Sequence, residues 1–123
     1  MKISKLIITA GILLNSAISF AQNQTNTKMN LADLHTEDKA VQTKMLFATM
    51  EGKVVSLQIQ KDKQLKEHIT TVPALLVCVK GEVVFENAKG ISFTLLSGDY
   101  VNIEPNVKHW VNAKIDSNLL LIK

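Results

Sequence analysis

The sequence contains no arginine, and this absence limits the functions to consider. All 14 basic residues are lysines, whereas surfaces that bind phosphate groups or nucleic acids usually use the fork of donors that arginine provides. Lys2 and Lys5 lie in an N-terminal segment that we expect to be removed, which leaves 12 lysines against 11 acidic residues. The remaining chain is almost neutral, so we expect no nucleic-acid partner.

Cysteine is nearly absent as well, because Cys78 is the single one in the sequence. One cysteine cannot form an intramolecular disulfide, so the domain must be stabilised by packing, which favours a closed β structure. Cys78 stands in the apolar run LLVCV. A cysteine with such neighbours is expected to be a buried core thiol and not a catalytic nucleophile.

The first 21 residues have the pattern of a secretory signal peptide. Two lysines precede a mostly apolar stretch from Leu6 to Ile18, and Ser19-Phe20-Ala21 supplies small residues for cleavage after Ala21. The apolar stretch has about 13 residues, fewer than the roughly 20 that a membrane-spanning helix needs. We therefore expect an exported protein, periplasmic or secreted, with no membrane segment in the mature form.

The mature chain is expected to contain one all-β domain, residues 31–123, after a flexible polar lead-in at 22–30. Short apolar segments recur at a spacing of roughly 8–12 residues with turn residues between them, which predicts a sandwich or barrel. One short helix is predicted near 31–41. The predicted strands are 43–49, 53–60, 65–70, 74–80, 82–86, 91–96, 100–103, 109–114 and 118–122.

Residues 62–81 resemble the first of the two sequence motifs of the cupin superfamily. His68 stands at the first histidine of that motif and Gly81 at its closing glycine, while Asp62 replaces the opening glycine. Both glycine and aspartate suit the tight turns that these positions require.

Residues 98–113 resemble the second cupin motif. Gly98 and His109 are in register with it, whereas Asn106 replaces a glycine and Ala113 replaces the last asparagine. Asparagine accepts a positive φ better than most residues, so the first change is compatible with the turn. The two resemblances imply a cupin-type double-stranded β-helix, that is, a jelly-roll barrel.

The metal ligands of the family are matched only in part. The resemblance implies one divalent metal, iron, manganese or zinc, held by three histidines and a glutamate, but Thr70 and Ala74 replace the second histidine and the glutamate. His68 and Thr70 should share the inner face of one strand, with His109 approaching from its neighbour. We expect His68, Thr70, Ala74 and His109 to line a pocket, with His68 and His109 as candidate metal ligands. His35 is a remote ligand or a surface residue.

Three functions fit this sequence. The first is a barrel that binds a small molecule, with a weak or degenerate metal site at most. The second is a dioxygenase- or isomerase-like cupin metalloenzyme that uses His68 and His109, and the third is a storage or scaffold protein with a filled barrel. The family resemblance, together with strand 74–80, which is apolar on both faces, predicts a homodimer.

Overall fold

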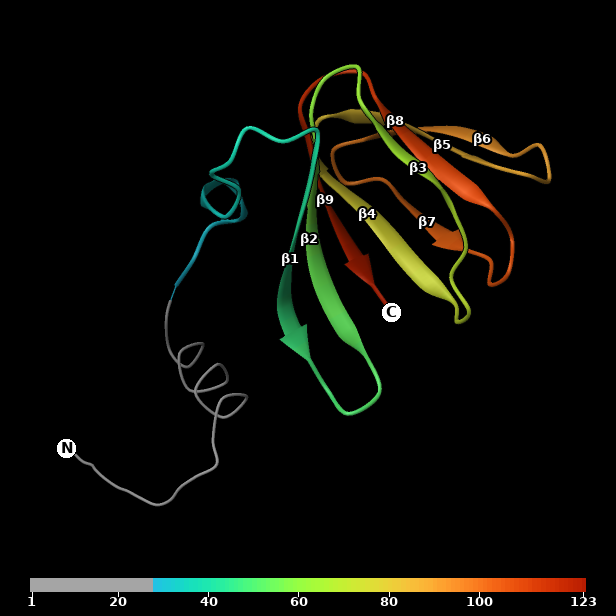
Figure 1. Ribbon diagram of the computed structural model, residues 1–123, viewed down its shortest axis with the longest axis horizontal. Helices are drawn as coiled ribbons and strands as arrows, with labels where there is room; N and C mark the ends of the chain where they lie inside the picture. Colours follow the sequence, from blue (N-terminus) through green and yellow to red (C-terminus); the bar gives the residue numbers. More distant parts are fainter. Residues whose placement is uncertain (1–27) are drawn as a thin grey trace.

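The computed structural model describes residues 28–123, and within them the chain forms nine β-strands and one short 3-10 helix (Figure 1). All nine predicted strands are present, with bounds within two residues of the prediction. The elements are η1 (Leu31–Asp33), β1 (Val41–Ala48), β2 (Lys53–Ile59), β3 (Gln64–His68), β4 (Ala74–Lys80), β5 (Glu82–Asn87), β6 (Ser92–Leu96), β7 (Tyr100–Ile103), β8 (His109–Ala113) and β9 (Ser117–Ile122).

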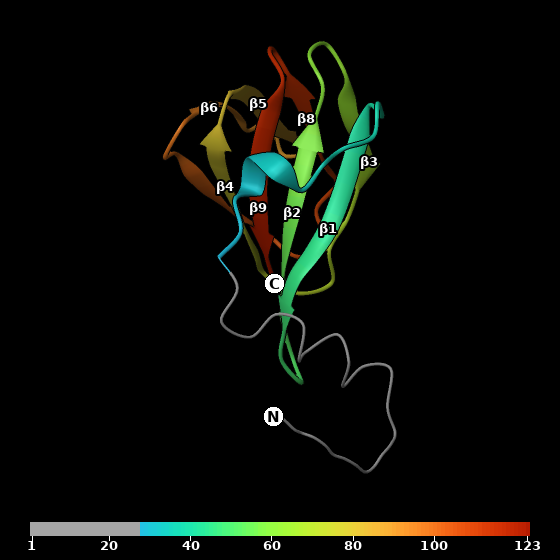
Figure 2. The ribbon, with the colours of Figure 1, turned by 90° about the vertical axis from the view of Figure 1, so that its left-hand side faces the viewer.

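The strands form two antiparallel sheets that face each other (Figures 1 and 2). The five-stranded sheet has the order β1-β2-β9-β4-β7 and the four-stranded sheet the order β3-β8-β5-β6. Strands distant in the chain, such as β2 and β9 or β3 and β8, are therefore neighbours. This arrangement confirms the predicted all-β jelly-roll fold.

The hydrophobic core lies between the sheets and is formed by alternate residues of the strands, because successive side chains of a strand point to opposite faces. Leu57 on β2 lies opposite Leu119 on β9, and both are almost completely buried. Phe85 on β5 lies opposite Val111 on β8 in the other sheet. The buried core residues are Leu57, Ile59, Ala74, Leu76, Cys78, Val83, Phe85, Leu95, Ile103, Val111, Ala113 and Leu119.

Cys78 belongs to this core, as predicted, with none of its surface exposed. Burial, and then the negative charge of Asp99, raises the pKa of its thiol. A thiol that is both inaccessible and protonated is a poor nucleophile, which confirms the structural interpretation of this residue.

Three turns of the predicted motifs have the backbone conformation that the sequence indicates. Gly81 has a φ of 119°, and Asp62 and Asn106, which replace motif glycines, both have a φ of 64°. Aspartate and asparagine are the residues that adopt this left-handed conformation most readily after glycine. The changes from the cupin motifs therefore preserve the turns.

The predicted helix at 31–41 is wrong in extent, because only Leu31–Asp33 is helical and the turn is a 3-10 helix. The side chain of Asn30 caps it by accepting a hydrogen bond from the N–H of Ala32. The following residues cross the outer face of the five-stranded sheet (Figure 2), where His35 Nε2 and Ser56 Oγ are hydrogen-bonded at 2.8 Å. Contact with the sheet, and not helix formation, sets the path of this segment.

The predicted signal peptide, and most of the predicted lead-in at 22–30, lie outside the described residues. Within residues 28–123, no helix is both long and apolar enough to span a bilayer.

Candidate functional site

The two histidines of the cupin-like motifs meet at one end of the barrel. His68 ends β3 and His109 begins β8, and the two residues are direct partners in the antiparallel pairing of these strands. Their ring centroids are 4.2 Å apart, with the ring planes at 59°. Antiparallel pairing places directly opposed side chains on the same face, which explains why residues 41 positions apart in sequence come into contact.

Hydrogen bonds orient both imidazole rings. Nδ1 of His68 is 2.7 Å from the carbonyl oxygen of Lys66, and Nδ1 of His109 is 3.2 Å from that of Val107. A carbonyl oxygen only accepts hydrogen bonds, so Nδ1 donates in each case and the neutral ring carries its lone pair on Nε2. Each Nε2 is thus an acceptor, and that of His68, which is partly exposed, can be reached by a ligand.

The environment of His109 favours the neutral imidazole. The residue is only 2% exposed and stacks on Phe85, with ring centroids 5.8 Å apart. Burial is the main cause that lowers the pKa of His109; the positive charges of His68 and Lys123 lower it further, and the hydrogen bond to Val107 acts in the opposite direction. The charge of Lys123 is thus one of the influences on His109.

The donors at this end do not fit a tightly held metal. Among residues 28–123, no three side chains of His, Cys, Asp or Glu gather into a group that could hold a metal ion. Ala74, at the position of the family glutamate, is buried in the hydrophobic core opposite Ile103. Thr70, at the position of the second histidine, offers one hydroxyl, which is a weak substitute for an imidazole.

The carboxylates nearest to the histidines in sequence are engaged elsewhere. Glu67 Oε2 is 3.4 Å from Lys108 Nζ, and Glu104 Oε2 is 2.7 Å from Lys89 Nζ, both on the surface. Neither completes a two-histidine, one-carboxylate set of the kind that binds iron in oxygenases.

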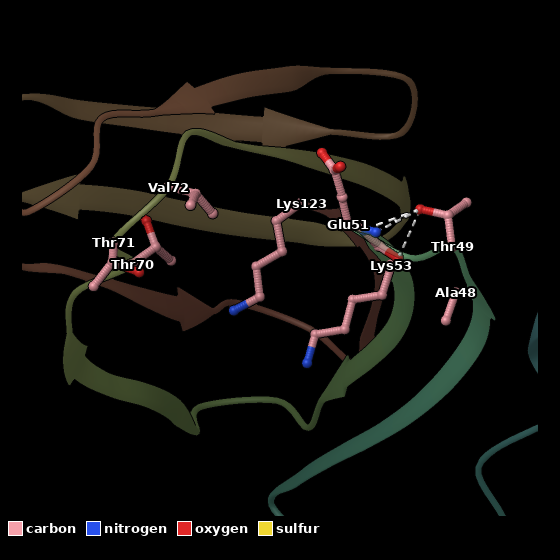
Figure 3. A pocket seen from close by; sticks show the side chains of 9 residues that line it. Ala48, Thr49, Glu51, Lys53, Thr70, Thr71, Val72 and Lys123 are labelled. Atoms are coloured by element: carbon pink, nitrogen blue, oxygen red, sulfur yellow. Dashed lines mark hydrogen bonds between the residues drawn. The ribbon is translucent and has the colours of Figure 1, made fainter. Parts of the chain in front are cut away.

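A hollow of about 380 Å³ opens at the same end of the barrel (Figure 3). Its walls come from the turn between β1 and β2, the loop that follows His68, and the end of β9, segments that lie together in Figures 1 and 2. Of the four predicted pocket residues, Thr70 lines this hollow, whereas Ala74 and the two imidazoles do not. The lining residues are Ala48, Thr49, Glu51, Gly52, Lys53, Thr70, Thr71, Val72 and Lys123.

Two lysines line this hollow at positions where the sequence motifs predict no site residue. Lys53 and Lys123 exchange backbone hydrogen bonds of 2.6 and 3.0 Å, which makes them direct partners and extends the pairing of β2 with β9 by one residue. The alternation of inward and outward residues predicts that both lysines face inward. On β2, Lys53 lies two residues before Val55, which is followed on the same inner face by Leu57. Lys123 lies directly opposite Lys53 and continues the inner face of β9 in the same way.

Comparison with known proteins shows similarity in structure only. No protein-family model matches the sequence, and no curated protein matches it significantly. Among solved structures, an RmlC-like cupin protein from Desulfovibrio desulfuricans superposes with a TM-score of 0.69 at 17% identity, over 80% of this chain and 94% of the other. A cupin superfamily protein from Desulfitobacterium hafniense gives 0.68 at 14% identity, over 76% and 84% of the two chains.

A third structure, a cupin-like protein from Thermotoga maritima, has a TM-score of 0.63 at 22% identity, over 68% of this chain and 67% of its own. Identities this low establish the shared architecture and leave function to be argued from the site itself.

Proposed function

Since the chain has a cupin fold, we propose that it is a barrel that binds a small molecule at the end where His68 and His109 meet. The observation that carries this proposal is the contact between the two imidazoles, with centroids 4.2 Å apart, at the end of the barrel that holds the open hollow. A volume of about 380 Å³ lies within the roughly 300–1,000 Å³ typical of small-molecule sites.

The chemistry of this end supports a binding role. The hollow combines polar and charged side chains, among them those of Thr70, Lys53 and Lys123, with the apolar side chains of Ala48 and Val72. The imidazole of His68, which is partly exposed beside this hollow, adds an oriented polar group whose Nε2 can accept a hydrogen bond. A concave site with a few convergent polar groups is the usual form of a ligand site.

A weak two-histidine metal site, or a dioxygenase- or isomerase-like enzyme built on it, is the second candidate. The hydrogen bonds from both Nδ1 atoms to carbonyl oxygens favour it, because metal-binding histidines are commonly oriented in this way. Two imidazoles without a carboxylate are nevertheless too few ligands for tight binding. Elemental analysis of protein purified without a metal-binding tag decides between the two candidates. Near-stoichiometric iron, manganese or zinc that disappears in His68→Ala would establish the metal site.

Binding itself is tested by a screen of small organic molecules for thermal stabilisation. A ligand at 100 times its Kd should stabilise the folded protein by about 2.7 kcal/mol. We expect a hit to lose this effect in His68→Ala and His109→Gln, and to keep it in His35→Ala, whose ring lies on the outer face of the barrel. Equal stabilisation of all three variants would refute the proposed site.

We also propose that the protein is exported, on the basis of the signal-peptide pattern in its first 21 residues.

We further propose that the protein forms a homodimer through the outer face of β4. The outward side chains Leu75 and Val77 are only partly buried, and Val79 is 37% exposed. The exposed Tyr100 of β7 lies opposite Val77 on the same face. A second copy would cover this apolar face. Sedimentation velocity should show a dimer that dissociates in Val79→Glu; a wild-type monomer at high concentration would contradict the proposal.

A further inference from the structure

The end of the barrel that holds the hollow carries an unusual pair of like charges. Lys53 and Lys123 lie directly opposite each other at the ends of β2 and β9 and belong to the inner row of each strand. Figure 3 shows both ammonium groups extending into the same hollow. Like charges on directly opposed residues destabilise a strand pair, so this arrangement is unfavourable for the protein without a ligand.

No side chain in the described part of the chain forms an ion pair with either of these lysines. Glu51 lines the same hollow, but its carboxylate is turned away from both ammonium groups (Figure 3). The two positive charges are therefore available to an anion that enters from solvent.

Thr70 provides an independent indication of a ligand. Thr70 lines the hollow, and only 5% of its surface is exposed. Its Oγ1 has no hydrogen-bond partner in the described part of the chain. Buried hydroxyl groups are nearly always hydrogen-bonded, so an unpaired one beside two lysines suggests a partner that is supplied by a ligand.

We propose that Lys53, Lys123 and Thr70 bind the carboxylate of a small organic acid. This inference rests on the proposed function and names the class of ligand. Lysines act as point charges and lack the planar fork of arginine, so two of them can neutralise one anionic group from different sides. Ala48 and Val72 line the same hollow and can contact the apolar part of an organic acid, which inorganic phosphate lacks.

The anion site lies near the histidine pair. Thr70 is two residues beyond His68, which ends β3, although neither imidazole lines the hollow itself. The carboxylate would be held by the lysines and the hydroxyl, and the remainder of the acid would lie toward the rings.

The test is an NMR titration of the protein obtained by expressing the full chain, with butyrate, its uncharged analogue butyramide and inorganic phosphate as probes. Butyrate should shift the backbone amide signals of Thr70, Thr71 and Lys123 in a saturable manner. Because a hydrogen bond to a charged group contributes about 1.5–3 kcal/mol, Lys53→Met and Lys123→Met should each weaken binding roughly tenfold or more. Thr70→Val, which keeps the side-chain shape, should also weaken it.

Lys80→Met is the matched control, because Lys80 is an exposed lysine at the far end of β4. It should bind butyrate like the wild type, and melting curves should show that every variant is folded. Butyramide binding as tightly as butyrate would overturn this inference and leave the proposed function intact. Tighter binding of phosphate, lost in both lysine variants, would overturn the carboxylate assignment. If no probe shifts these signals, the anion site is wrong, and the thermal screen then judges the small-molecule function separately.

Discussion

His68 and His109 are direct cross-strand partners whose rings are in contact, and the ring of His109 is held between His68 and Phe85. This position gives the two imidazoles different properties, although they have the same chemistry. His109 is almost completely buried, whereas His68 is partly accessible to a ligand from solvent. Burial, and to a smaller extent the positive charge of His68, lowers the pKa of His109.

Protonation of His109 is expected to make stability depend on pH. Its pKa in the folded state is lowered from 6.5, mainly by burial, so the unfolded chain binds a proton more readily than the folded protein. Above about pH 7 both states are neutral at this position and the contribution is complete. As the pH falls through 6.5 toward the lower folded pKa, the free energy of unfolding should decrease. Urea unfolding at a series of pH values measures this slope.

The control for this prediction is His109→Gln, which removes the titrating group and should reduce the slope between pH 7 and 5. The pKa of His35 is also lowered, by burial and by the charge of Lys44, so His35→Gln should remove a second part of the slope. An unchanged slope in His109→Gln would mean that the buried imidazole does not contribute to acid sensitivity.

The fold could be predicted from the sequence because the signals that determine it are local. Turn residues separate all nine strands, and Asp62 and Asn106 fit the positive φ that their positions require. The pairing of His68 with His109 followed from their places in two motifs. The helix at 31–41 failed because its path depends on contact between His35 and Ser56, which are 21 positions apart.

The anion site could not be predicted with the same ease, because it depends on three segments that are distant in sequence. Lys53 and Lys123 look like ordinary polar strand ends until the pairing of β2 with β9 places them side by side. The unpaired hydroxyl of Thr70 is likewise visible only in three dimensions. Alternation identifies the inner face of each strand, but it does not identify which strands are neighbours.

Gly81 should tolerate substitution less well than Gly98, although both have a positive φ. A Cβ at Gly81 would lie 2.2 Å from Ser117 Oγ and 2.7 Å from its Cα, whereas nothing lies within 4 Å of a Cβ at Gly98. Gly98→Ala should therefore show only the backbone penalty, about 1–2 kcal/mol. Gly81→Ala should lose more than that, because Ser117 must also move.

Chemical denaturation of the two alanine variants measures the difference. Gly90→Ala is a second control, since its φ is positive and its Cβ position is also open. Equal losses in Gly81→Ala and Gly98→Ala would show that the contact with Ser117 relaxes without cost.

Lys53→Met should increase the stability of the protein without ligand. The substitution removes one of two like charges on directly opposed residues, an unfavourable interaction of roughly 0.2–1 kcal/mol, and keeps the length of the side chain. The wild type should also gain stability when salt is added, since screening weakens the repulsion, and Lys53→Met should gain less.

Lys80→Met is again the control, because Lys80 lies opposite Asn118 and should show neither effect. If Lys53→Met lowers the free energy of unfolding instead, the ammonium group has a favourable partner within the protein and is not free to bind an anion. A gain in stability together with weaker butyrate binding would be the signature of a residue kept for function at the expense of stability.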